Sequence, residues 1–338
     1  MAKDEKVEWI SGVRVITKET RVILDPTHSG VVGKGDHRFI SHAHADHTQG
    51  ISSRAATYTT AATRMLYERI RKKPVKDFRE IRIRHRVRLD DVEVVPINAG
   101  HMLGSVQFKI VTPNKTLLYT GDLNCIDTLT TDKAESVQCD LLLMEATYGN
   151  PFYVFPDREA TYAEIIEWAT QRAKVGHVPT FHVYAAGKAQ EIVRLFNVYT
   201  KLPVVVSPLV SAANEIYNNA GLRLEYSVAG ETSDQDLETG PYVYVTTPSD
   251  SLLPARCERA VATGWALRSS PSRFPAFPLS SHADFRQLVE FVRLSRAKTV
   301  YLFTGYSALF SAYLRKRFGI DARPIPQVTQ KRLLEFSR

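Results

Sequence analysis

Residues 39–47 read Phe-Ile-Ser-His-Ala-His-Ala-Asp-His, which places three imidazoles and one carboxylate within six positions. The candidate ligands are His42, His44, Asp46 and His47. Neutral imidazole nitrogens and carboxylate oxygens suit zinc, and four such groups in one tight turn can face two adjacent ions. The alternative is a polar surface loop that happens to be rich in histidine, but the strict spacing argues against it. The sequence therefore predicts a metal site in this turn.

Two further ligand candidates follow at the ends of predicted strands. His101 lies in a turn between two glycines, and Asp122 follows the segment Tyr-Thr-Gly. Taken singly each is weak evidence, because a lone histidine in a turn is more often structural. Together with the first motif they complete two ligand sets, with His42, His44 and His101 for one ion, Asp46 and His47 for the other, and Asp122 as the bridge. Two ions about 4 Å apart can activate water and clamp a phosphodiester for in-line attack.

The elements expected around these residues change in character along the chain. The first half is predicted to be rich in strands, over 13–25, 38–41, 92–97, 105–112, 116–120 and 141–145, with one helix over 59–71. From about residue 157 helices (160–174, 188–199) alternate with strands (180–184, 202–206). That alternation is typical of a parallel sheet with helices on its faces. A strand over 299–303 and a helix over 308–318 are expected near the end of the chain.

Length and charge limit the class of protein. A chain of 338 residues exceeds the usual size of one core, which favours two domains or one domain with a large insertion. No segment approaches the roughly 20 apolar residues of a membrane helix, and the first residues are charged, so a cytoplasmic protein is predicted. The net charge of +8 favours a polyanionic partner, although a merely basic surface would give the same value.

Two basic features could contact a phosphate backbone. Between residues 81 and 89 arginines alternate with apolar residues, so a strand would place Arg82, Arg84, Arg86 and Arg88 on one face. Such a row could follow phosphates, and a solvated edge strand protected by charge is an equally good explanation. Lys188 follows a glycine at a predicted helix start, where free backbone N–H groups and an ammonium favour phosphate. The alternative there is a solvated lysine.

The order and type of the ligands resemble the metallo-β-lactamase superfamily, and three later segments resemble the beta-CASP nucleases, which insert a cassette into that fold. Those segments are 141–149 (Leu-Leu-Leu-Met-Glu-Ala-Thr-Tyr-Gly), 187–191 (Gly-Lys-Ala-Gln-Glu) and 279–284 (Leu-Ser-Ser-His-Ala-Asp). The resemblance covers nearly the whole chain. It implies an α/β fold, in which an αββα sandwich formed by 1–156 and 272–338 surrounds an α/β cassette at 157–271.

The same resemblance implies roles for individual residues. The acid that matches Glu145 orients a metal-ligating histidine, and the histidine that matches His282 is the general acid or a phosphate contact near the leaving group. Asp46 would serve catalysis as a ligand of the second ion. Substrate contacts are implied at Lys188, Gln190 and Ser281. The implied cofactor is zinc.

Thr304 departs from the pattern of the RNA-processing branch. That branch, which includes the polyadenylation endonucleases, usually has a histidine before glycine at this point, whereas this chain reads Leu-Phe-Thr-Gly over 302–305. Threonine cannot replace imidazole as a zinc ligand. We therefore expect one tight zinc and a weaker second site, which Mg²⁺ or Mn²⁺ could also fill.

These features favour a nuclease that acts on DNA. The Artemis and Apollo group of repair nucleases also lacks the final histidine, and Thr-Gly-Trp at 263–265 resembles bacterial DNA ligase-associated exonucleases, although those often keep it. We predict a metal-dependent DNA exonuclease in repair, with 5′ polarity implied by resemblance alone, and an RNA-processing ribonuclease as the alternative. The nearly complete ligand sets disfavour a binding protein with a structural metal. The cassette and the basic charge disfavour a small-molecule hydrolase.

Overall fold

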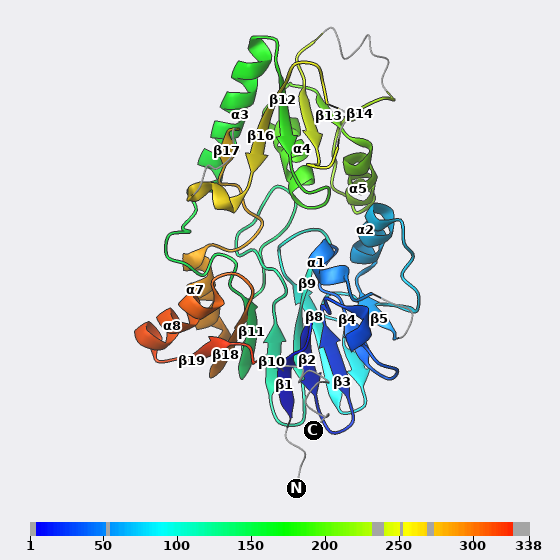
Figure 1. The fold of residues 1–338 in the computed structure, drawn as a ribbon, viewed down its shortest axis with the longest axis vertical. Helices are drawn as coiled ribbons and strands as arrows, with labels where there is room; N and C mark the ends of the chain where they lie inside the picture. Colours follow the sequence, from blue (N-terminus) through cyan, green and yellow to red (C-terminus); the bar gives the residue numbers. More distant parts are fainter. Residues whose placement is uncertain (1–4, 52–54, 232–239, 251–252, 269–273, 327–338) are drawn as a thin grey trace, which may run out of the picture.

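The computed structural model describes residues 5–51, 55–231, 240–250, 253–268 and 274–326. Its described strands form three sheets in two lobes, with two sheets in the lower lobe of Figure 1 and one in the upper lobe. The predicted α/β fold of a metallo-β-lactamase sandwich with an added unit is confirmed. Sheet A has the order β1 (Lys6–Trp9), β2 (Val13–Ile16), β3 (Arg21–Leu24), β4 (His37–Phe39), β5 (Thr57–Thr59) and β6 (Phe78–Glu80).

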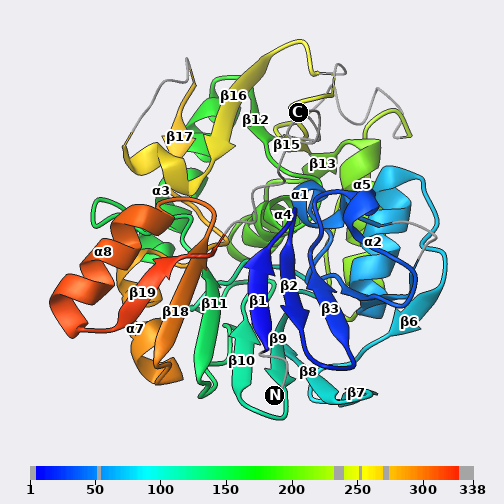
Figure 2. The same ribbon diagram turned by 60° about the horizontal axis from the view of Figure 1, so that its bottom comes forward.

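Sheet B is built from two distant parts of the chain. Its order is β19 (Asp321–Pro324), β18 (Thr299–Phe303), β11 (Leu141–Glu145), β10 (Thr116–Tyr119), β9 (Val106–Val111), β8 (Val92–Asn98) and β7 (Val87–Leu89). β18 pairs in parallel with β11, so the C-terminal segment completes the sheet that the N-terminal half begins. Helices α7 (Phe285–Ser295) and α8 (Ser307–Phe318) lie beside it in Figures 1 and 2, and α1 (Ala45–Thr48) and α2 (Ala61–Arg71) lie at sheet A.

The alternation of side chains along β11 explains its unbroken apolar run. Leu141 and Leu143 join the core between sheets A and B, where Phe39 and Phe108 also pack. Leu142 and Met144 point the other way, into the core under α7 and α8. A strand that is covered on both faces favours apolar residues at successive positions, which explains the run from Leu141 to Met144; the fifth buried residue of β11 is the acid Glu145. Figure 2 shows β1–β3 stacked over β8–β10 in this arrangement.

The upper lobe is a parallel sheet with helices around it. Sheet C has the order β14 (Ser227–Val228), β13 (Val204–Val206), β15 (Val243–Thr246), β12 (Val178–His182), β16 (Cys257–Ala262) and β17 (Ala276–Phe277). Helices α3 (Arg158–Lys174), α4 (Lys188–Tyr199) and α5 (Pro208–Asn219) accompany it. Because β17 belongs to this sheet, the chain returns to the lower lobe after residue 277, later than the predicted boundary at 272. The remaining boundaries stay predictions.

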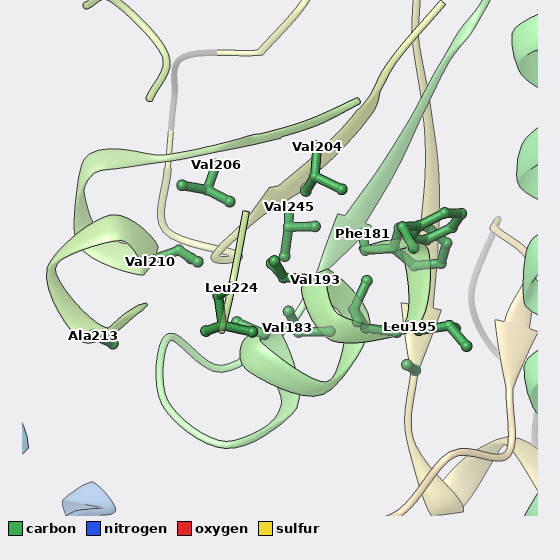
Figure 3. Packing of buried hydrophobic residues seen from close by; sticks show 14 of the residues in the cluster. Phe181, Val183, Val193, Leu195, Val204, Val206, Val210, Ala213, Leu224 and Val245 are labelled. Atoms are coloured by element: carbon green, nitrogen blue, oxygen red, sulfur yellow. The ribbon is translucent and has the colours of Figure 1, made fainter. Parts of the chain in front are cut away.

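The core of the upper lobe continues into the lower one. Figure 3 shows a packed group from these elements: Phe181 of β12, Val183 directly after it, Val193 and Leu195 of α4, Val204 and Val206 of β13, and Val245 of β15. Leu66 of α2 and Met102 belong to the same buried cluster. The backbone N–H of Leu103 also donates to the hydroxyl of Tyr217 on α5 (3.2 Å). These contacts fix the upper lobe against the turn that carries His101.

Candidate metal centre

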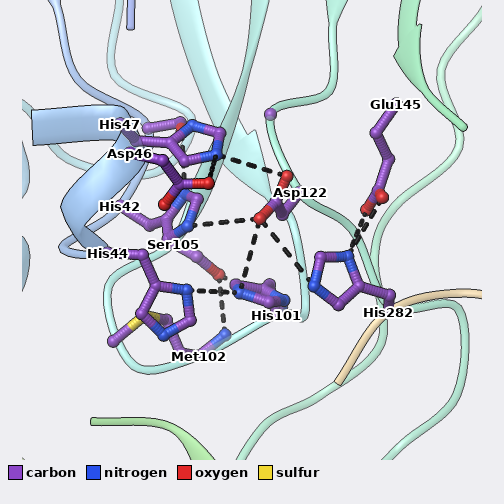
Figure 4. A network of polar contacts seen from close by, with 12 residues as sticks. His42, His44, Asp46, His47, His101, Met102, Ser105, Asp122, Glu145 and His282 are labelled. Atoms are coloured by element: carbon purple, nitrogen blue, oxygen red, sulfur yellow. Dashed lines mark hydrogen bonds and ion pairs between the residues drawn. The ribbon is translucent and has the colours of Figure 1, made fainter. Parts of the chain in front are cut away.

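The predicted ligands follow strands of both lower sheets. The segment after β4 carries His42 and His44, helix α1 carries Asp46 and His47, the β8–β9 connection carries His101, and the turn after β10 carries Asp122. Gly121 makes the approach of Asp122 possible, because its φ is +55° and a Cβ there would lie 2.7 Å from the Ser41 hydroxyl oxygen. Figure 4 shows the resulting cluster of side chains.

The first predicted ligand set is assembled. His42, His44, His101 and Asp122 each offer one ligand atom, and these four atoms lie within 4.8 Å of one another. His44 Nδ1 is 3.1 Å from His101 Nε2, and His42 Nε2 is 3.5 Å from Asp122 Oδ2. His42 Nε2 is buried and has no hydrogen-bond partner among the described residues. Buried polar atoms are normally hydrogen-bonded, so a buried ring nitrogen without a partner fits the role of a metal ligand.

The outward nitrogens of two ligands are held by backbone carbonyls from elsewhere in the chain. His44 Nε2 lies 3.2 Å from the carbonyl oxygen of Ala186, and His101 Nδ1 lies 2.8 Å from that of Ser281. An N–H on each of these atoms donates to the carbonyl, which leaves His44 Nδ1 and His101 Nε2 with free lone pairs. Burial also lowers the pKa of His42 and of His101 well below the ordinary value, which keeps both rings neutral.

The second predicted set shares Asp122 with the first. His47 Nε2 lies 3.4 Å from Asp122 Oδ1 and 3.6 Å from Asp46 Oδ2. The Asp46 side chain is 75% exposed, so it faces the open side of the centre. Thr304 is also exposed, and its hydroxyl donates to the carbonyl of Phe303 (2.7 Å).

Asp25 was not identified from the sequence, yet it supports both sets from behind. Its Oδ2 is 2.7 Å from His47 Nδ1 and accepts from the Tyr119 hydroxyl at 2.9 Å, and its Oδ1 accepts from the backbone N–H of Ser41 (2.7 Å). The Ser41 hydroxyl contacts His42 Nδ1 (2.9 Å). A carboxylate behind a ligating imidazole fixes its tautomer and orientation. Asp25 could have been found in the sequence because it is an aspartate directly after a strand, as Asp122 nearly is.

Glu145 and His282 form a pair at the edge of the metal centre. His282 Nδ1 lies 3.0 Å from both carboxylate oxygens of Glu145, and Nε2 lies 3.9 Å from Asp122 Oδ2. Glu145 also accepts from the backbone N–H of Leu123 (2.7 Å). The expectation that Glu145 orients a metal-ligating histidine stays a prediction. The histidine that Glu145 contacts is His282, which together with Asp122 and Glu145 forms a further group able to hold a metal (Figure 4).

The surroundings of His282 favour its charged form and fix its backbone. Burial by itself lowers the pKa of this histidine, but the charges of Glu145 and Asp122 outweigh burial and raise the pKa to about 9. The imidazole therefore carries a proton at neutral pH. Two residues later, Asp284 and Gln287 cap the start of α7 reciprocally, with bonds of 2.8 and 3.2 Å.

The predicted substrate contacts on α4 are less accessible than the sequence suggested. Gln190 is completely buried, where its amide accepts from Gly187 N (2.7 Å) and donates to Ala185 O (2.9 Å). Direct contact between Gln190 and a substrate is therefore excluded in this conformation, and its side chain instead holds the turn before α4. Lys188 is also buried, 3.8 Å from Glu191, and burial lowers its pKa to about 8.

The prediction of one arginine-bearing strand over 81–89 was wrong. Only β7 is a strand in this region, because Arg84 adopts a φ of +65° and its backbone N–H donates to Pro96 O (2.8 Å). The arginines pair instead with glutamates, and these pairs are Arg82 with Glu80 (2.8 Å), Arg84 with Glu135 (3.0 Å), Arg86 with Glu93 (3.6 Å) and Arg88 with Glu93 (3.8 Å). All four side chains remain largely exposed, but they do not form one row.

Comparison with known proteins agrees with this geometry. The family model described as the beta-lactamase superfamily domain matches residues 19–203, which include all six predicted metal ligands. The chain belongs to the metallo-β-lactamase superfamily. One solved structure, of a protein of unknown function from Enterococcus faecalis V583, aligns with a TM-score of 0.66 at 13% identity, over 97% of this chain and 98% of that one. That likeness concerns the fold alone.

The metallo-β-lactamase relatives include proteins named for DNA and for RNA. The chain is 29% identical over 307 residues to a probable DNA ligase of Opitutus terrae, across 87% of this chain and 29% of the ligase. It is 29% identical to an RNase J-like protein of Methanocaldococcus jannaschii (57% and 52% covered). It is 27% identical to the 5′ exonuclease Apollo of Gallus gallus (75% and 55% covered). This member of the superfamily thus spans about a third to a half of these relatives.

The predicted absence of a membrane segment can be compared with the helices of the structure. Within the described ranges, no helix is both long enough and apolar enough to cross a membrane.

Proposed function

We propose that the protein is a metal-dependent phosphodiester hydrolase that cuts nucleic acid. The observation that carries this proposal is the shared carboxylate, because Asp122 lies between the three imidazoles of the first set and His47 of the second, with the Glu145–His282 pair directly beside it. A bridged pair of metal sites suits displacement at phosphorus, in which an attacking and a leaving oxygen both need stabilisation. The distant nuclease relatives support a nucleic-acid substrate.

The chain's own residues would divide the work as follows. His42, His44, His101 and Asp122 would hold one ion, and Asp46, His47 and Asp122 the other. When bound, the two ions supply Lewis acidity at the phosphate and lower the pKa of water. Glu145 binds Nδ1 of His282 and so directs the Nε2 proton toward the open centre, where it can pass to the leaving oxygen. We also propose that Ser281 and the exposed arginines bind the substrate. Lys188 is proposed to do so as well, because its ammonium, unlike the amide of Gln190, has no hydrogen-bond partner among the described residues.

The metal content tests the role assigned to Thr304. We propose zinc at both positions, with the second site weaker because Thr304 supplies no imidazole. Purified protein should retain about one equivalent of metal through mild chelation, and activity should rise when divalent ions are added back. The strands β10, β11 and β18 are parallel neighbours, so Thr304 follows β18 at the sheet edge that carries Asp122.

A matched pair of variants sharpens this test. Thr304 has a φ of +57°, which histidine tolerates better than most residues, so Thr304→His should fold and retain a second equivalent. Thr304→Val should keep the wild-type content of about one equivalent. If wild-type protein already keeps two equivalents after the same treatment, another residue completes the second site.

We further propose that the substrate is DNA and that the protein trims it from the 5′ end during repair. The resemblance of Thr-Gly-Trp at 263–265 to ligase-associated exonucleases and the match to Apollo support this choice, and the RNase J-like match supports RNA as the second candidate. Matched oligonucleotides labelled at either end should be cut faster as DNA, and rising salt should weaken binding to DNA and RNA alike. Faster cleavage of RNA, with DNA bound but uncut, would replace this proposal by the ribonuclease.

A further inference from the structure

An exposed tyrosine lies directly against the first metal ligand set. Tyr184 belongs to the segment between β12 and α4, and its ring centroid is 5.7 Å from that of His44. The side chain is 72% exposed, although it is large and partly apolar. Two residues further on, the carbonyl of Ala186 contacts His44 Nε2, so the backbone of this segment is held at the metal centre. The exposed ring of Tyr184 therefore contacts His44, one of the proposed metal ligands, directly.

A second exposed aromatic, Trp265, is connected to the centre through His282. The ring of Tyr148 is 6.0 Å from His282 and 4.8 Å from Trp265. Trp265 belongs to the short helix η2 (Gly264–Leu267), also contacts the ring of Tyr153 (5.3 Å), and is 41% exposed. The rings of His282, Tyr148 and Trp265 thus form a series that runs from the centre to the surface.

The packing around Trp265 keeps its ring at the surface. A Cβ at Gly264 would lie 2.5 Å from the Tyr148 hydroxyl, so only glycine lets η2 rest on that ring. Beside this helix Phe152 is 74% exposed, and the guanidinium of Arg268 lies 5.4 Å from its ring. Exposed aromatic rings with a cation nearby are the groups that bind single-stranded nucleic acids, because bases stack on rings and phosphates attract the charge; here the Arg268 guanidinium lies over the Phe152 ring.

From these contacts we propose that Tyr184 and Trp265 stack unpaired bases on either side of the phosphate to be cut, which makes single-stranded nucleic acid the preferred substrate class. Bases within a duplex already stack on each other and cannot offer their faces to protein rings. Stacking is tolerant of sequence because every base has a π face. This inference rests on the proposed nuclease function, and it assigns the upper lobe, which supplies both rings, the task of selecting the strand.

Binding can be measured without cleavage, in chelator, with a single-stranded oligonucleotide that carries 2-aminopurine. Stacking on the wild-type protein should quench its fluorescence. Tyr184→Ala and Trp265→Ala should each weaken binding about tenfold and remove part of the quench, which corresponds to the loss of one stacked base. Tyr184→Phe and Trp265→Phe should stay close to wild type because they keep a ring. Phe318→Ala is the matched control, since Phe318 is 40% exposed at the far end of α8.

Two outcomes would overturn the inference. One is equal binding of single strands by the wild type and by both alanine variants. The other is equal cleavage of duplex and single strands by metal-loaded protein. Because Trp265 also packs on Tyr148, a loss seen only in Trp265→Ala and accompanied by a lower melting temperature would also count against stacking. Quenching without any cleavage after metal is restored would leave the inference standing and refute the nuclease function.

Discussion

Replacement of Asp122 with asparagine should remove metal from both sites and reduce cleavage about a thousandfold or more, which corresponds to several kcal/mol of lost stabilisation. Both carboxylate oxygens are engaged, with Oδ2 3.5 Å from His42 Nε2 and Oδ1 3.4 Å from His47 Nε2. Asparagine offers one weaker oxygen ligand, no charge, and an amide that would face an imidazole nitrogen. Metal content and cleavage should be measured on the same preparation.

An aspartate far from the centre provides the control for this variant. Asp90 is exposed in the turn between β7 and β8 and has a φ of +40°, a conformation that asparagine also adopts readily. Asp90→Asn should therefore keep metal, activity and melting temperature. If Asp122→Asn protein retained two equivalents of metal and near-normal cleavage, the bridging role would be refuted.

The second large effect is expected at His282. Alanine there should lower kcat by about a hundredfold to ten-thousandfold, because the proton donor for the leaving oxygen is lost, while KM and metal content stay near wild type. Glu145→Gln should lower kcat less, since glutamine can still accept from Nδ1 but no longer favours the charged imidazole. Steady-state kinetics together with metal analysis distinguish a role of His282 in the chemical step from a structural role. A variant that lost metal, or only raised KM, would show that His282 does not act in the chemical step.

The position of the ligands could be predicted from local sequence because each lies directly after a strand. His42 follows β4 of sheet A and Asp122 follows β10 of sheet B, so their contact depends on how the two sheets stack, and the sequence indicated it only through the order and type of the ligands. The supports behind the ligands could not be found in this way. Asp25 and His47 are 22 positions apart and Glu145 and His282 are 137 positions apart, and only the packed fold brings each pair into contact.

The wrong predictions have specific physical causes. The arginine and apolar alternation over 81–89 has the period of a strand, but the left-handed turn at Arg84 breaks it, and Ile83 is left exposed. Gln190 lies in the first turn of a helix, where a polar side chain is usually solvated, yet the upper lobe covers it completely. Both errors come from tertiary contacts that override a local pattern. The short strands β15 and β16 were likewise absent from the predicted elements, since runs of four to six residues carry little periodic signal.

The most direct test of metal-dependent phosphodiester hydrolysis is a chelation and add-back experiment on end-labelled single-stranded DNA and RNA. Wild-type protein stripped of metal should leave both strands intact, and addition of zinc should restore cleavage of at least one of them in proportion to the metal bound. Asp122→Asn protein treated in parallel should stay inactive. Protein that binds zinc at the His42, His44 and His101 set but cuts neither strand would contradict the account, as would cleavage that persists without metal.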